Sequence, residues 1–169
     1  MRLLISFAAL MLSGCWTGDG LYSDGDARPA VPSGIYQMSY AGETHTERVS
    51  LLPNGLTKFT DEDGTQLFGF VPLDAKGTRF VAWDRDSEAP PSDHTQGYLV
   101  LESRANGEFF LYMPNCIGNE AEIAKRAGAT VRVSTVNECQ FPTRASLETA
   151  MREVRISREA VRLVRTPGK

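Results

Sequence analysis

An acidic segment, residues 84–94, carries the side chains that are best suited to chemistry. Asp84, Asp86 and His94 fall within "DRDSEAPPSDH", together with further acidic residues. Carboxylates bind divalent cations, and carboxylates beside an imidazole raise its pKa toward neutral pH. Loops that are longer than their neighbours also often carry function. We therefore take Asp84, Asp86 and His94 as a candidate ligand or metal site, with a solvated, charge-rich loop as the alternative.

Motifs that would indicate a particular enzyme are missing from the sequence. It contains no Gly-x-Ser-x-Gly elbow, no His-Glu-x-x-His helix and no Gly-rich phosphate loop. The "DEDG" stretch from Asp61 is similar to the start of a calcium loop, but Gln66 and Pro72 stand where that loop needs glycine and glutamate. We assign no catalytic residue and no cofactor. An enzyme that uses the loop around His94 ranks behind a non-enzymatic binding protein.

The first residues of the chain have the pattern of a secretory signal sequence. A single basic residue, Arg2, precedes an uncharged apolar run that is too short to cross a bilayer as a permanent helix. At the end of this run, Leu12-Ser13-Gly14-Cys15 resembles the lipobox of bacterial lipoproteins. The resemblance implies cleavage between Gly14 and Cys15 and attachment of lipid to the Cys15 thiol. An ordinary signal peptide with a coincidental cysteine is the alternative.

The lipoprotein resemblance also implies where the protein resides. Two or three acyl chains hold a protein stably at a membrane, so the mature chain would be anchored to the bilayer without spanning it. Trp16 follows Cys15; in Gram-negative lipoproteins an aspartate at that position tends to cause retention in the inner membrane. We therefore expect the periplasmic face of the outer membrane, with the inner membrane or the cell surface as alternatives.

The expected partners are the membrane, through the covalent lipid, and an envelope protein, glycan or lipid. A formal net charge of −3 gives no support for nucleic-acid binding, which requires an excess of basic residues.

The other two cysteines, Cys116 and Cys139, form an even pair once Cys15 carries lipid. Disulfides form and persist in an oxidising periplasm, so we predict a Cys116–Cys139 bridge. In the chain-entropy model such a bridge stabilises the fold by about 3 kcal/mol. A metal-binding pair and a nucleophilic thiol are the alternatives.

The composition divides the chain into three parts. The lipoprotein resemblance implies that residues 1–14 are the signal peptide and that residues 15–33 begin with the lipidated cysteine; the rest of this range is a Gly-, Asp-, Ser- and Pro-rich stretch that predicts a flexible linker. Residues 34–169 form a single globular domain of a comfortable size for one core.

The central part of the domain has the pattern of a β meander. Residues 34–40, "GIYQMSY", alternate with period two, and turn signals follow at Asn54-Gly55, Asp63-Gly64 and Asn106-Gly107. Strands at roughly ten-residue spacing with such turns predict an antiparallel meander or a partly open small barrel.

The last third predicts two short helices and a closing strand, which makes the fold class α+β. Asn119, Glu122 and Gly128 are placed as an N-cap, a capping box and a C-terminal glycine around the first helix. Apolar residues at helical spacing after Thr143 predict the second helix, and "AVRLVRT" predicts the closing strand.

The aromatic side chains of the predicted strands leave two binding functions open. They pack a core, or, if the sheet closes, some of them line a cavity for a small apolar ligand. Gly34-Ile35-Tyr36 at the start of the meander resembles the first strand of lipocalins, with Tyr36 in place of the usual tryptophan. We expect a non-enzymatic binding or envelope-interaction module, with a lipocalin-like carrier as the alternative.

Overall fold

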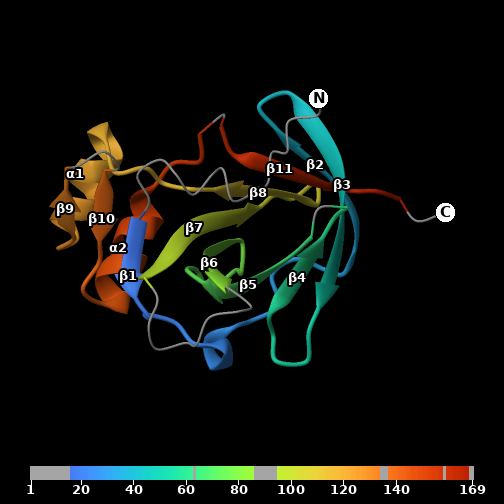
Figure 1. Cartoon of the computed structure of the whole chain (residues 1–169), viewed down its shortest axis with the longest axis horizontal. Coiled ribbons are helices and arrows are strands. Elements are labelled where there is room, and N and C mark those ends of the chain that lie inside the picture. Colours follow the sequence, from blue (N-terminus) through green and yellow to red (C-terminus); the bar gives the residue numbers. More distant parts are fainter. Residues whose placement is uncertain (1–15, 63, 86–94, 134–136, 158, 168–169) are drawn as a thin grey trace.

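The computed structural model describes residues 16–62, 64–85, 95–133, 137–157 and 159–167, and its centre is a closed antiparallel barrel of eight strands (Figure 1). The barrel strands are β2 (Gly34–Tyr40), β3 (Glu43–Leu51), β4 (Thr57–Thr60), β5 (Thr65–Pro72), β6 (Arg79–Arg85), β7 (Thr95–Ser103), β8 (Glu108–Tyr112) and β11 (Val161–Arg165). Strands β2 to β8 pair in chain order, and β11 pairs with both β8 and β2, which closes the ring. The predicted α+β small barrel is confirmed.

A tight hairpin between β3 and β4 fixes which side chains of these strands face inward. The Leu52 N–H donates to the Leu56 carbonyl over 2.8 Å, and Gly55 has a φ of 87°, a conformation that favours glycine. The resulting register places Val49 opposite Phe59. Because side chains alternate along a strand, this register decides the facing of every neighbour on β3.

The inside of the barrel, which we call the inner core, is filled by side chains from all eight strands. Its large members, such as Phe68 and Phe70, make edge or tilted aromatic contacts with their neighbours. The buried residues of the inner core are Val31, Tyr36, Met38, Val49, Phe59, Phe68, Phe70, Phe80, Ala82, Leu99, Leu101, Phe109, Leu111, Val161 and Leu163. None of them is more than 8% exposed, so the interior is a packed core.

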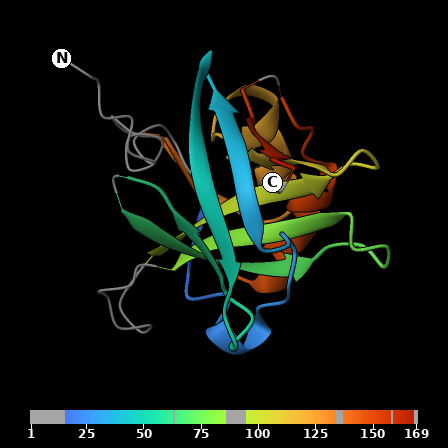
Figure 2. The same ribbon diagram turned by 90° about the vertical axis from the view of Figure 1, so that its right-hand side faces the viewer.

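A second layer covers one side of the barrel (Figures 1 and 2). It consists of β1 (Trp16–Asp19), α1 (Gly118–Arg126), β9 (Thr130–Arg132), β10 (Glu138–Gln140) and α2 (Arg144–Glu153). Strand β1 pairs antiparallel with β7 and parallel with β10, and β10 pairs antiparallel with β9. Strands β1, β10 and β9 therefore extend the barrel sheet beyond β7.

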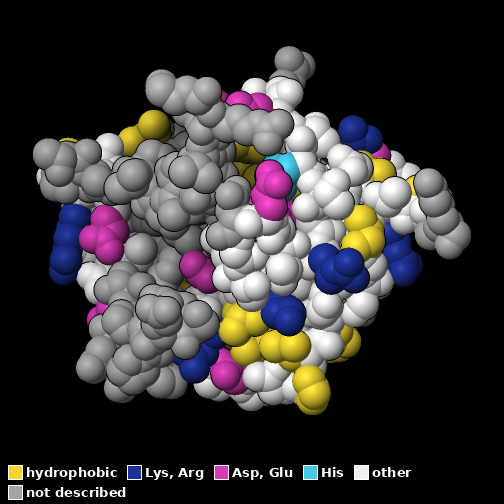
Figure 3. Space-filling view, turned by 45° about the vertical axis from the view of Figure 1, so that its right-hand side comes forward, with side chains coloured by type: hydrophobic (Ala, Val, Ile, Leu, Met, Phe, Trp, Pro, Cys, Tyr) yellow, Lys and Arg dark blue, Asp and Glu magenta, His cyan; other side chains and the backbone are white. Residues whose placement is uncertain are grey.

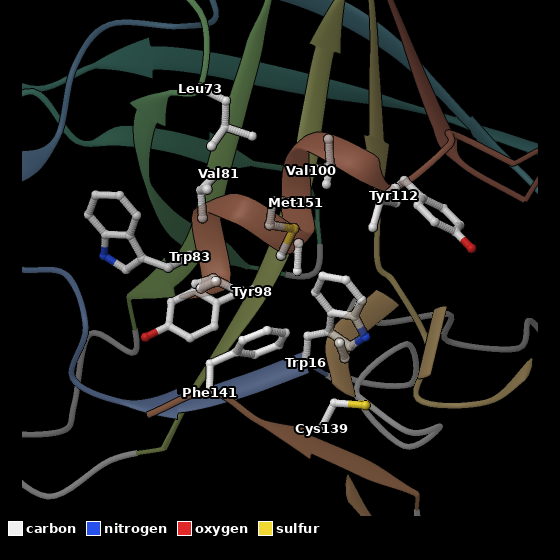
Figure 4. Packing of buried hydrophobic residues seen from close by; sticks show 14 of the residues in the cluster. Trp16, Leu73, Val81, Trp83, Tyr98, Val100, Tyr112, Cys139, Phe141 and Met151 are labelled. Carbon is white, nitrogen blue, oxygen red and sulfur yellow. The ribbon is translucent and has the colours of Figure 1, made fainter. Parts of the chain in front are cut away.

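The outer core lies between the barrel wall and this second layer (Figure 4). Val81, Trp83, Tyr98 and Val100 project from β6 and β7 toward residues of β1, β10 and α2, including Met151. The indole of Trp83 lies against the backbone of Gly69, where an added Cβ would meet the ring at 2.0 Å. Glycine is therefore required on β5 beneath this tryptophan.

Residues 16–33 do not form the flexible linker that their composition predicts. Trp16 is fully buried in β1, and its indole N–H donates to the Asn115 carbonyl over 2.9 Å. Tyr22 stacks on Trp83 with ring centroids 4.9 Å apart, after which a 3₁₀ turn, η2 (Asp24–Asp26), leads toward the barrel. The prediction was wrong because Gly, Asp and Pro in this segment form turns between buried aromatic side chains and do not form an unstructured linker.

Both predicted helices form, with one difference in capping. Thr143, the residue before the predicted second helix, caps α2 through a hydrogen bond from the Ser146 N–H. Helix α1 begins earlier than predicted, with Ile117 at the N-cap and no side-chain cap, while Gly128 follows its end with a φ of 92°. Among the described residues, no helix has the length and apolarity needed to cross a membrane.

Candidate functional site

The barrel mouth, defined here as the end formed by the β2–β3 and β4–β5 turns, carries ionisable side chains on its inner edge. Along β3, alternation places His45 and Glu47 on the same face as the inner-core residue Val49. Glu47 is only 4% exposed and is the buried carboxylate among the described residues. Its side chain enters the barrel interior where the apolar packing ends.

Asp61 completes the mouth cluster, a name we use for His45, Glu47 and Asp61. Because Arg48 lies opposite Thr60, the next residue of the β4 end, Asp61, comes beside Glu47. The His45 Nε2 atom is 3.4 Å from the Glu47 Oε1 atom, and one ligand atom from each of the three residues lies within 4.8 Å of the others. Two hairpins therefore bring an imidazole and two carboxylates to one point.

The electrostatics of the mouth cluster are dominated by Glu47. Burial, as the largest cause, together with the charge of Asp61 and a side-chain hydrogen bond with Asp61, raises the pKa of Glu47 to about 7. The Glu47 Oε2 atom has no hydrogen-bond partner among the described residues. A buried carboxylate with an unpartnered oxygen costs folding free energy, so this arrangement favours binding of a positively charged group.

The cluster is open to solvent on one side. The His45 side chain is 42% exposed and Asp61 is half-buried, while Glu47 lies beneath them. In the space-filling view a histidine lies at the surface beside acidic side chains (Figure 3). A ligand could therefore approach from outside the barrel and reach the buried carboxylate without unfolding a strand.

Only part of the acidic segment predicted from the sequence as a candidate site lies within the described structure. Asp84 is the second-last residue of β6, lies opposite Phe68 of β5 and is half-buried, whereas Asp86 and His94 lie outside the described residues. Gly14 and Cys15, the predicted cleavage and lipidation residues, also lie outside them.

The cysteine pair lies away from the barrel mouth, in the second layer. Cys116 and Cys139 form the predicted disulfide, with a Cα–Cα distance of 5.4 Å. The bridge joins the segment before α1 to strand β10, and both cysteines are buried in the outer core. Its position indicates a structural role in holding the second layer together.

Sequence reasoning did not identify Glu47 or His45 as site residues, and it considered Asp61 only as the start of the "DEDG" stretch, which does not continue as a calcium loop. The signal that could have found Glu47 is its spacing of two from Val49, which places a carboxylate on an apolar strand face.

Comparison with known proteins gives no relative from which a function can be transferred. No protein-family model matches the chain, and neither the curated proteins nor the solved structures contain a match. The function must therefore be inferred from the site itself.

Proposed function

We propose that this protein is a lipid-anchored envelope lipoprotein whose barrel is a non-enzymatic binding module, with the mouth cluster as its recognition site. The observation that carries the proposal is Glu47, a buried carboxylate with an oxygen that has no partner among the described residues. Natural proteins retain such destabilising groups mainly where they bind something. The ligand or partner surface therefore presents a positive charge to the mouth.

The packing of the barrel favours recognition at the mouth over transport of an apolar ligand inside. A carrier needs an internal cavity of several hundred Å³. The inner-core side chains, with large aromatics such as Phe59, Phe80 and Phe109, are at most 8% exposed. A lipocalin-like carrier would therefore have to displace several of these side chains before it could accept a ligand.

Anchoring through Cys15 would hold the domain close to the membrane. Trp16, the next residue, is buried in β1 and hydrogen-bonded to Asn115. A lipid on Cys15 would then have no flexible spacer between itself and the fold. In this proposal the protein lies at the periplasmic face of the outer membrane and binds an envelope protein, glycan or lipid there.

Membrane fractionation of Cys15→Ser tests the anchor. We expect the variant to remain uncleaved or to appear in the soluble fraction, because the thiol that accepts the lipid is gone. Ser13→Ala, which leaves that thiol in place, serves as the matched control and should fractionate with the membranes. A Cys15→Ser protein that is still mature, acylated and membrane-bound would refute the lipoprotein proposal.

Site-specific photo-crosslinking in intact cells tests the binding module. A crosslinker at Thr44, an exposed residue next to His45, should capture an envelope component, and Glu47→Gln should abolish that product. A crosslinker at Lys76, an exposed residue in the turn between β5 and β6 at the opposite end of the barrel, is the control. Products that persist in Glu47→Gln, or that are equal at both ends, would contradict recognition at the mouth.

A further inference from the structure

The mouth cluster has the composition of a metal site as well as that of a general cation site. We propose that His45, Glu47 and Asp61 coordinate a divalent first-row transition metal ion of the Zn²⁺ type. This inference rests on the proposed function, because it names the cation that the same site recognises. It differs from the metal site considered in the sequence, which lay in the segment around His94.

The donor set favours a borderline metal ion over Mg²⁺ or Ca²⁺. Imidazole nitrogen is a ligand for Zn²⁺, Cu²⁺, Ni²⁺ and Fe²⁺, whereas Mg²⁺ and Ca²⁺ take oxygen ligands almost exclusively. The cluster offers one nitrogen, from His45, and carboxylate oxygens from Glu47 and Asp61. One histidine with two carboxylates therefore fits Zn²⁺ or a similar ion.

The distances within the cluster are close to those that tetrahedral coordination requires. With metal–ligand bonds of roughly 2.1 Å, neighbouring ligand atoms of a tetrahedral site are about 3.4 Å apart. His45 Nε2 and Glu47 Oε1 are already 3.4 Å apart. All three ligand atoms lie within 4.8 Å of one another, so a side-chain adjustment of about an ångström at Asp61, the half-buried member, would complete the geometry.

Burial provides the second, independent indication of a ligand. Glu47 is more than nine-tenths buried, and its Oε2 atom has no hydrogen-bond partner within the described chain. Desolvation of a carboxylate oxygen that lacks a hydrogen-bond partner is costly, and coordination of the carboxylate to a cation removes that cost. The two exposed or half-buried partners, His45 and Asp61, leave the solvent side free for water ligands. Three protein ligands with an open side indicate exchangeable binding, in contrast to a closed structural zinc site.

Isothermal titration calorimetry with ZnCl₂ on the purified, tag-free full chain, stripped of metal beforehand, tests the inference. We expect one binding site, which His45→Ala, Glu47→Gln and Asp61→Asn each weaken by at least about tenfold. Glu62→Gln is the matched control, since it makes the same chemical change at the exposed neighbour of Asp61 and should leave affinity within about twofold. Circular dichroism of each variant verifies that it is folded.

Two results would overturn the metal assignment. The first is the absence of Zn²⁺ binding by folded wild-type protein; the second is Zn²⁺ binding that His45→Ala leaves unchanged, or that Mg²⁺ displaces at equal concentration. Spermidine, an organic polycation, separates this failure from failure of the proposed function. If spermidine binds wild type but not Glu47→Gln while Zn²⁺ does not bind, the mouth recognises a cation other than a metal. If neither binds, recognition of positive charge at the mouth is refuted as well.

Discussion

At β6 and β7 the two faces of the barrel wall are both apolar, yet they are covered in different ways. The inner core is made by strands that follow one another in the chain and meet across short turns. The outer core joins segments that are far apart in sequence, such as Trp16, which packs on Phe141 with ring centroids 5.0 Å apart. Local hairpins therefore build the inside, and long-range docking builds the outside.

The two cores differ in their expected roles: the outer core stabilises the fold, and the mouth end of the inner core carries the proposed binding site. Within the described chain, the outer core consists of aliphatic and aromatic side chains without a buried carboxylate, and the Cys116–Cys139 bridge reinforces it. The inner core, by contrast, ends at the mouth in Glu47, a buried carboxylate two residues along β3 from Val49, which pairs with Phe59. Changes in the outer core should therefore weaken the fold, whereas a change at Glu47 should strengthen it at the expense of binding.

Trp83→Ala should give the largest loss of stability. The indole is fully buried between Gly69 and Tyr22, so its removal leaves a large cavity in the outer core. We expect a loss of about 3–5 kcal/mol in the free energy of unfolding, measured by urea denaturation. Leu51→Ala, at a side chain that is 40% exposed, is the control and should cost less than about 1 kcal/mol. Equal losses for the two variants would contradict an independent outer core.

The contact between Trp83 and Gly69 can be isolated by a double-mutant cycle. Gly69→Ala forces a methyl group into the indole, so it should destabilise the wild-type background by about 1–3 kcal/mol. In a Trp83→Leu background the ring is gone, and the same Gly69→Ala change should cost much less. Additive effects would show that the glycine is required for another reason.

Removal of the disulfide should have the next largest effect. Cys116→Ser combined with Cys139→Ser frees a loop with a sequence separation of 23 in the unfolded chain. We expect a loss of about 3 kcal/mol by chemical denaturation. Hydrogen exchange should show the loss of protection first in α1, β9 and β10, with the barrel strands protected as in the wild type. Uniform loss across the barrel would mean that the second layer is not a separate stabilising unit.

The contrast between the cores also explains which parts of the fold could be predicted from sequence. Strand β2, the hairpin at Asn54-Gly55 and the closing strand β11 follow from period-two alternation and turn chemistry, which are local. The burial of residues 16–33 could not be predicted in this way. Trp16 and Tyr22 are isolated aromatics among turn residues, and their partners, Asn115 and Trp83, are distant in sequence.

Glu47→Met should stabilise the protein when metal is absent. The substitution replaces a buried carboxylate by an apolar side chain of similar length, which removes the desolvation cost within the inner core. We expect a gain of about 1–2 kcal/mol in chelator-containing buffer, together with loss of cation binding. Glu43→Met, at an exposed position on the same strand, is the control and should change stability little. Destabilisation by Glu47→Met would mean that the contacts of the carboxylate with His45 and Asp61 stabilise the fold by more than its burial costs.

The mouth cluster shows why a site can escape sequence analysis even when the fold does not. Leu51 pairs with Thr57 across a loop that includes Gly55, and this register brings Asp61 beside Glu47. A two-residue Asn-Gly turn would shift the pairing by one residue and send one of the two carboxylates to the other face of the sheet. The site therefore depends on a turn length that the Asn-Gly signal alone does not specify.

The smallest expected effect concerns the ion pair that joins the 3₁₀ turn η2 to helix α2. The Asp26 Oδ1 atom is 2.8 Å from Arg144 Nη1, and hydrogen bonds from the Ser23 backbone, with help from Arg144, lower the pKa of Asp26 below its ordinary value. A lowered pKa means that the contribution to stability is complete above about pH 4 and disappears as the pH falls through the folded-state pKa. Both side chains are partly solvated, so Asp26→Asn should cost less than about 1 kcal/mol at pH 6. The difference in the free energy of unfolding between wild type and variant, measured by urea denaturation, should narrow toward pH 3. A difference that is constant with pH would show that the charge of Asp26 does not stabilise its contact with α2.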